Sequence, residues 1–95
     1  MLEKTVEQYL VDRVTMAGGV AEKTVGPGGR GYFDRVVLLG GGRVIFVEVK
    51  KPRGSSTSPH QRERHARYRQ LGAEVAVVKT FADVDRLLAG GVASP

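Results

Sequence analysis

The feature that most constrains the fold of this chain is a pair of apolar runs separated by three consecutive glycines. The runs cover residues 32–39 and 43–49 and are rich in aromatic and β-branched residues, which suit a pleated, half-buried surface. Their spacing predicts a β-hairpin. A three-residue loop at Gly40–Gly42 would place Asp34 opposite Glu48, whereas a two- or four-residue loop, or a bulge, would break that register.

Helix and strand signals along the rest of the chain complete an α/β fold. Apolar residues at helical spacing predict a first helix over about residues 2–17, which Gly18 and Gly19 end. Ser58 and Pro59 are typical of the N-cap and the first residue of a helix. The α-β-β-β-α-β-α order predicts a mixed β-sheet flanked by helices, with a right-handed crossover within its parallel pair. The predicted elements are a helix at 2–17, strands at 20–25, 32–39 and 43–49, a helix at 59–71, a strand at 73–79 and a short helix after Thr80.

The composition excludes several classes of protein and points to an anionic partner. Ninety-five residues predict a single domain over residues 1–95, and the absence of cysteine excludes disulfides, cysteine metal sites and thiol nucleophiles. No apolar run approaches the roughly 18 residues that span a bilayer, and the N-terminal residues lack a signal-peptide pattern, so a cytoplasmic protein is expected. A net charge of +5, a pI near 10.0 and a basic stretch between Lys50 and Arg69 favour a polyanion as partner.

Two ionisable residues end the second strand of the predicted hairpin. Side chains alternate along a strand, so Glu48 and Lys50 project from the same face. A charged pair at the end of an apolar strand is costly to desolvate without a reason. With Asp34 opposite, the two carboxylates would repel each other unless a cation lies between them, and their oxygens suit Mg²⁺ or Mn²⁺. The alternative is a plain ion pair at the edge of a sheet, with Asp34 facing solvent.

Asp34 followed by Glu48-Val49-Lys50 resembles the D…(D/E)-x-K signature of the PD-(D/E)XK nuclease superfamily, whose core has the element order given above. The closer resemblance is to virus-type replication–repair nuclease (VRR-NUC) domains, including the short stand-alone phage versions, and it covers nearly the whole chain. In that family proline usually precedes the aspartate, where this chain has Phe33, and Lys51 replaces the residue, often alanine, that follows the lysine. The supporting segments are Gly18-Gly19, Lys23, residues 31–37 and 45–50, Pro59-His60-Gln61 and residues 71–75.

The resemblance implies a metal site built on the two acids. Asp34 and Glu48 would bind Mg²⁺ or Mn²⁺, and the carbonyl of Val49 would complete the site. A glutamate of the first helix also tends to reach the metal region in this family. Glu3 matches that position best, with Glu7 one turn on, although a carboxylate near a helix N-terminus is favourable without any catalytic role.

The resemblance also implies roles for residues outside the metal site. Lys50 would orient the attacking water and steady the phosphate, and Gln61 would lie near it at the start of the second helix. Gln61 also stands three residues after Ser58, the spacing of a capping box, which explains it without catalysis. His60 and His65 are expected to be surface or capping residues rather than metal ligands. The candidates for DNA contact are Lys51, Arg53, Arg62 and Lys23.

These expectations combine into a metal-dependent DNA endonuclease that selects branched DNA, such as four-way junctions or flaps, rather than a sequence. A small footprint and a symmetric substrate favour a homodimer. The main alternative is a non-catalytic nucleic-acid-binding module on the same fold. An interaction domain with an incidental basic surface is a second alternative. A sequence-specific restriction-type enzyme is a third, for which the chain has little room for base-reading insertions.

Overall fold

The computed structural model describes residues 5–24, 33–51 and 57–90. The order of elements is the predicted α-β-β-β-α-β-α, which confirms the α/β fold class. The elements are α1 (Val6–Met16), β1 (Val20–Lys23), β2 (Arg35–Leu39), a 3-10 turn (Gly40–Gly42), β3 (Arg43–Val49), α2 (Pro59–Gln70), β4 (Glu74–Val78) and α3 (Phe81–Leu88). None of the helices in these described ranges is both long and apolar enough to cross a membrane.

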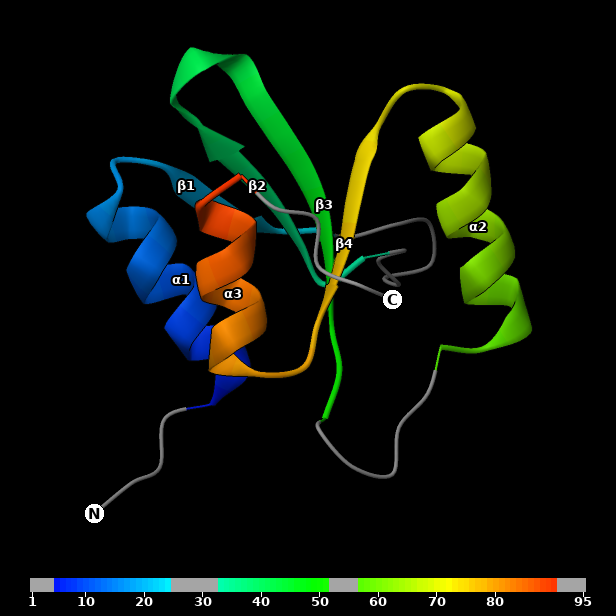
Figure 1. The fold of residues 1–95 in the computed structure, drawn as a ribbon, viewed down its shortest axis with the longest axis horizontal. Helices are drawn as coiled ribbons and strands as arrows, with labels where there is room; N and C mark the ends of the chain where they lie inside the picture. Colours follow the sequence, from blue (N-terminus) through cyan, green and yellow to red (C-terminus); the bar gives the residue numbers. More distant parts are fainter. Residues whose placement is uncertain (1–4, 25–32, 52–56, 91–95) are drawn as a thin grey trace.

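The four strands form one mixed sheet in the order β1-β2-β3-β4. The pairs β1–β2 and β2–β3 are antiparallel, and β3–β4, which α2 connects, is the predicted parallel pair. Helices α1 and α3 pack against each other on one face of the sheet, and α2 lies on the other face beside β4 (Figure 1). The sheet is therefore covered on both faces around β3 and β4, where the strands are most apolar.

The hairpin between β2 and β3 has the predicted register. Leu39 pairs with Arg43 across the three glycines, and Arg35 pairs with Val47 further along the ladder. Gly41 and Gly42 adopt positive φ angles of 80° and 79°, which side chains other than glycine rarely tolerate. The glycines thus allow the tight reversal that sets which side chains of the two strands face each other.

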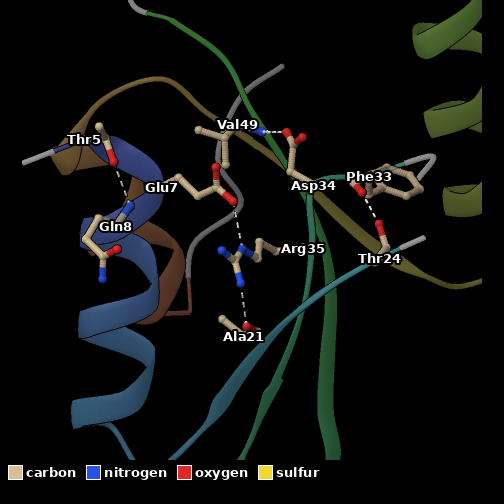
Figure 2. Close-up of polar contacts among 9 residues, drawn as sticks. All are labelled: Thr5, Glu7, Gln8, Ala21, Thr24, Phe33, Asp34, Arg35 and Val49. Atoms are coloured by element: carbon tan, nitrogen blue, oxygen red, sulfur yellow. Dashed lines mark hydrogen bonds and ion pairs between the residues drawn. The ribbon is translucent and has the colours of Figure 1, made fainter. Parts of the chain in front are cut away.

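The first residues of α1 and β2 differ from the prediction. Thr5 is extended and accepts a hydrogen bond from Gln8 N at 3.0 Å, so α1 begins at Val6 rather than near residue 2 (Figure 2). A threonine in this conformation is an N-cap, a signal that the apolar periodicity does not contain. Strand β2 begins at Arg35, and Phe33 and Asp34 form a bend before it. Residues 1–4, 25 and 32 lie outside the described part of the chain.

The main core lies between the sheet and the pair α1 and α3. It is built from fully buried aliphatic side chains contributed by every described strand from β2 to β4 and by both helices. On β3 the inward residues are Ile45 and Val47, which alternate with Phe46 and Glu48 on the opposite face. The buried members are Leu10, Val14, Val37, Ile45, Val47, Ala76, Val78, Val84 and Leu87.

A second, aromatic cluster packs between α2 and the other face of the sheet. The ring of His65 stacks on Phe33 with centroids 5.2 Å apart, and Tyr68 contacts both Phe33 and Phe46. His65 is only 2% exposed, so its expected place on the surface is wrong. The correction has a physical cause: α2 carries few apolar side chains, and histidine and tyrosine supply the packing surface that leucine or valine would otherwise provide.

Candidate active site

The candidate site lies where three elements meet at one end of the sheet. Strand β3 ends there at Val49, and β2 begins there after Asp34. The first turn of α2 approaches from the face of the sheet opposite α1 and α3 (Figure 1). Asp34 N donates to Val47 O at 3.0 Å, which extends the β2–β3 contact beyond the regular ladder. The arrangement holds the backbone on both sides of Glu48 in place.

Glu48 is the centre of this group. Its side chain belongs to the face of β3 that looks toward α2, and the residue is 7% exposed. Lys50 Nζ lies 3.6 Å from Glu48 Oε1, and Gln61 Nε2 donates to the same oxygen at 3.2 Å. Gln61 Oε1 in turn accepts from Lys50 Nζ at 3.0 Å. The three side chains form a closed triangle. Glu48 and Lys50 project the same way, as strand alternation predicted, and they also form the ion pair that the alternative interpretation expected.

The second oxygen of this carboxylate has no donor among the residues that the structure describes. Within that part of the chain, Glu48 Oε2 is buried and forms no hydrogen bond. Burial raises the pKa of Glu48, and the nearby charge of Asp34 raises it further, while Lys50 and Arg64 act in the opposite direction. A buried carboxylate oxygen without a partner is unfavourable by itself, and a bound cation would satisfy it and lower the repulsion from Asp34.

Asp34 is fixed by the backbone of the neighbouring strand. Its Oδ2 accepts a hydrogen bond from Val49 N at 2.7 Å, next to the end of β3 (Figure 2). Thr24 Oγ1 donates to the carbonyl of Phe33, which holds the bend before β2 against the end of β1 (Figure 2). Asp34 is exposed, and the regular pairing of β2 with β3 ends at Arg35 and Val47, so the direct opposition of Asp34 and Glu48 stays a prediction. The charge of Asp34 nevertheless raises the pKa of the Glu48 carboxyl.

Gln61 also closes the N-terminus of α2. Ser58 Oγ accepts from Gln61 N at 3.2 Å, and Gln61 Oε1 accepts from Ser58 N at 3.0 Å, which is a complete capping box. The same Gln61 side chain therefore caps the helix and contacts Glu48 and Lys50. The two interpretations of its spacing from Ser58 are compatible, and both contacts are present.

The other predicted site residues are spread around this centre. Glu7 Oε2 accepts from Arg35 Nε at 2.9 Å, and Arg35 also donates to Ala21 O, which ties α1 to β1 and β2 (Figure 2). Arg62 Nη1 donates to Thr57 O at 2.6 Å, and Lys23 is exposed at the end of β1. Lys51 is exposed directly after Lys50. Glu3 and Arg53 lie outside the described residues.

The sequence interpretation did not place Arg64 near the centre, and it expected His65 at the surface. Arg64 and His65 share the sheet-facing side of α2 with Gln61 and Tyr68, and these four are its least exposed side chains. Their spacing of three and four residues could have indicated the buried side, because such positions lie on one face of a helix. Burial lowers the pKa of His65, and the charges of Arg69, Lys50 and Arg64 add to that effect.

The comparisons with known proteins agree with this arrangement. No protein-family model matches the sequence. A protein of Acyrthosiphon pisum secondary endosymbiont phage 1, named "Putative nuclease p44", is 46% identical over 76 residues, which cover 80% of this chain and 81% of that protein. A solved structure named "VRR_NUC domain" is 39% identical, with a TM-score of 0.79, and the match covers 88% of this chain and 90% of the other. The chain belongs to the VRR-NUC family.

This membership confirms the resemblance that the ordered set of sequence segments indicated. The VRR-NUC match spans most of the chain, so it includes the elements that carry Asp34, Glu48, Lys50 and Gln61. The phage relative is of similar length, which is consistent with a short phage-type VRR-NUC domain. The described residues contain no group of three or more histidine, cysteine, aspartate or glutamate side chains that could hold a metal.

Proposed function

We propose that the protein is a nuclease that hydrolyses phosphodiester bonds in DNA at the site formed by Asp34, Glu48 and Lys50. The observation that carries the proposal is the triangle of Glu48, Lys50 and Gln61 with an unsatisfied carboxylate oxygen, in a chain of the VRR-NUC family. A structural ion pair alone would leave no reason to bury an oxygen without a donor.

Asp34 and Glu48 are the residues that would hold a divalent cation, Mg²⁺ or Mn²⁺, together with the carbonyl of Val49. Hard oxygen donors of this kind suit either ion. Such a cation would lower the pKa of a bound water and offset negative charge on the phosphate. Glu3, proposed as a further ligand, lies outside the described residues. Water, a backbone carbonyl or a substrate oxygen would supply the remaining ligands.

Lys50 is proposed to contact the reacting phosphate and orient the attacking water. Its Nζ is held at 3.0 Å by Gln61 Oε1 and near Glu48, so the ammonium group is positioned before substrate arrives. A preorganised positive charge beside the developing phosphate charge favours the transition state. Gln61 is proposed to position both partners, because its amide contacts Lys50 through oxygen and Glu48 through nitrogen.

The DNA backbone is proposed to lie across the end of the sheet and the first turns of α2. Lys51, Arg53, Arg62 and Lys23 are the residues proposed to contact its phosphates. Such contacts position DNA without reading its sequence, which supports selection of a branched structure rather than a base sequence. A homodimer would present two such sites to a four-way junction. Support for it comes from exposed Val20, Leu38 and Val44, which stand opposite one another on the uncovered face of β1, β2 and β3.

The decisive experiment is cleavage of linear, flap and four-way-junction DNA with Mg²⁺ or Mn²⁺, compared with EDTA. Lys50→Ala is the control variant, and sedimentation or light scattering reports the oligomeric state. Metal-dependent cleavage by the wild type, absent in Lys50→Ala, is expected. Cleavage that persists in EDTA or in Lys50→Ala would contradict the proposed site.

The second candidate is a nucleic-acid-binding module without catalysis, favoured by the net charge of +5. Both candidates bind DNA, so binding does not separate them. Glu48→Ala separates them, because it abolishes cleavage in an enzyme, whereas a binding module shows no cleavage in either form. DNA binding by Glu48→Ala is expected to persist in both cases.

A further inference from the structure

One arginine of α2 stands apart from the others by its position on the helix. Gln61, Arg64, His65 and Tyr68 follow the i, i+3, i+4, i+7 spacing of a single helix face, and they are the α2 residues that are not exposed. His65 and Tyr68 pack on Phe33, and Gln61 contacts Glu48 and Lys50. Arg64 therefore lies one turn from Gln61, on the side of α2 that meets the sheet.

The other arginines of α2 are exposed. Arg62 is exposed and donates to Thr57 O at 2.6 Å, which braces the segment before the helix. Arg69 donates to Val75 O at 3.1 Å, beside the start of β4 and far along the helix from its first turn. Arg67 is exposed one turn beyond Arg64. Arg64 is the half-buried arginine of this helix.

The position of Arg64 on α2 also places it beside the candidate active site. Gln61, one turn earlier on the same face of the helix, donates to Glu48 Oε1 and accepts from Lys50 Nζ. The half-buried guanidinium group of Arg64 therefore adds a positive charge next to the residues that meet at Gln61.

We propose that Arg64 binds a non-bridging phosphate oxygen of the DNA strand held at the Asp34–Glu48–Lys50 site. Guanidinium groups form paired hydrogen bonds with phosphate oxygens, which a lysine ammonium cannot reproduce. Arg64 is half-buried, so its side chain is expected to lose less conformational entropy on binding than an exposed arginine would. This inference rests on the proposed nuclease function.

The rival explanation is that Arg64 serves only to keep Glu48 ionised. The two roles differ in what substrate binding requires. A phosphate contact strengthens DNA binding, depends on salt and is retained in EDTA, whereas a charge partner of Glu48 changes the metal-dependent step. Removal of one phosphate contact is expected to lower the slope of log affinity against log salt by about one.

The experiment compares Arg64→Ala, Arg64→Lys and Arg67→Ala with the wild type on the same four-way-junction DNA. Arg67→Ala is the matched control, because it removes an identical charge from the same helix at an exposed position. Binding is measured in EDTA across a salt series, and KM and kcat are measured with Mn²⁺. Thermal melting of each variant confirms folding, and Arg64→Lys keeps the charge if Arg64→Ala unfolds.

The expected result for Arg64→Ala is weaker binding in EDTA by about tenfold, a salt slope reduced by about one, and a matching rise in KM. Arg64→Lys recovers the slope but only part of the affinity, and Arg67→Ala changes binding less. An Arg64→Ala variant with the wild-type slope, or with a loss no larger than that of Arg67→Ala, overturns the proposal. If the wild type does not cleave but the slope still falls, the nuclease proposal fails while the phosphate contact stands.

Discussion

Gln61 Nε2 donates to Glu48 Oε1 across 3.2 Å, which joins the first turn of α2 to the end of β3. The contact brings together residues that are 13 positions apart in the chain, and the oxygen of the same amide accepts from Lys50. Because the backbone of Gln61 is fixed by the capping box with Ser58, its side chain reaches the carboxylate from a rigid base. Helix capping and site geometry are therefore coupled in this fold.

Gln61→Ala is expected to reduce kcat by roughly tenfold or more, since a loss of about 1.4 kcal/mol in the transition state corresponds to a factor of ten. The reason is that both Glu48 and Lys50 lose a fixing hydrogen bond. The same substitution removes half of the capping box, so a stability loss of about 1 kcal/mol is also expected. Steady-state cleavage and thermal melting measure the two effects separately.

Ser58→Ala separates helix capping from site geometry. It removes the hydroxyl that accepts from Gln61 N but leaves the Gln61 amide with its contacts to Glu48 and Lys50. A similar stability loss with nearly unchanged kcat is expected. Equal falls of kcat in Ser58→Ala and Gln61→Ala would show that Gln61 acts only as a cap.

Glu48→Gln is expected to lower the cleavage rate by roughly a hundredfold or more. In EDTA the variant is expected to be at least as stable as the wild type. The pKa of Glu48 is raised in the folded state by burial and by Asp34. A raised carboxyl pKa means that the folded protein binds the proton more tightly, so ionisation destabilises it as pH rises through that pKa. An amide at this position avoids the penalty. Melting curves of both proteins at pH 7 in EDTA measure this difference in stability. A large fall in Tm for Glu48→Gln would contradict the view that burial of the ionised Glu48 carboxylate destabilises the fold.

Added Mn²⁺ is expected to raise the Tm of the wild type and not that of Glu48→Gln. A ligand that binds only the folded state stabilises it by about 2.7 kcal/mol when its concentration is a hundredfold above Kd. Ca²⁺ serves as a second ion with the same charge. Equal shifts in both proteins would place the cation elsewhere than on Glu48 and Asp34.

The hairpin and the face on which Glu48 lies could be predicted because local rules determine them. Three glycines permit one tight reversal, and strand alternation then assigns every side chain to a face. The pairing of Leu39 with Arg43 confirms the register on which the meeting of Asp34 and Glu48 depends. Family resemblance added Gln61, which spacing alone would have assigned to a helix cap.

Residues whose environment depends on tertiary packing could not be predicted in the same way. The sequence of α2 is polar almost throughout, so no apolar periodicity marks His65 as buried. Its burial follows from contacts with Phe33, a residue on another element. The pairing of Glu7 with Arg35 joins α1 to β2 and has no local signal either. Such long-range pairs become visible only when the layers are assembled.

Gly19→Ala is expected to lower the free energy of unfolding by about 2 kcal/mol. A Cβ at this position would lie 2.5 Å from Leu38 O and 2.8 Å from a methyl of Leu39, and a backbone carbonyl within the β1–β2 pair cannot move aside cheaply. Gly40→Ala is the matched control, because its Cβ would meet nothing within 4 Å, and a change within about 0.5 kcal/mol is expected. Urea denaturation measures both, and equal effects would contradict the close approach.

His65→Phe is expected to remove part of the pH dependence of stability between about pH 7 and pH 5. Burial lowers the pKa of His65, so the folded protein favours the neutral ring and the unfolded chain takes up the proton first. Stability is then fully present above the ordinary histidine pKa of 6.5 and falls as pH drops below it toward the lowered value. Phenylalanine keeps a ring against Phe33 but has no proton to bind.

The same substitution also tests the two unpartnered ring nitrogens. Neither Nδ1 nor Nε2 of His65 has a hydrogen-bond partner in the described ranges of the chain, and a buried polar group left unsatisfied costs about 1–3 kcal/mol. His65→Phe is therefore expected to be more stable than the wild type at pH 7, and the difference should widen at pH 5. His60→Gln is the control at an exposed histidine and should keep the wild-type pH profile. If His65→Phe and the wild type lose stability in parallel on acidification, the ring is not held neutral by its burial, and the acid sensitivity must arise from other groups.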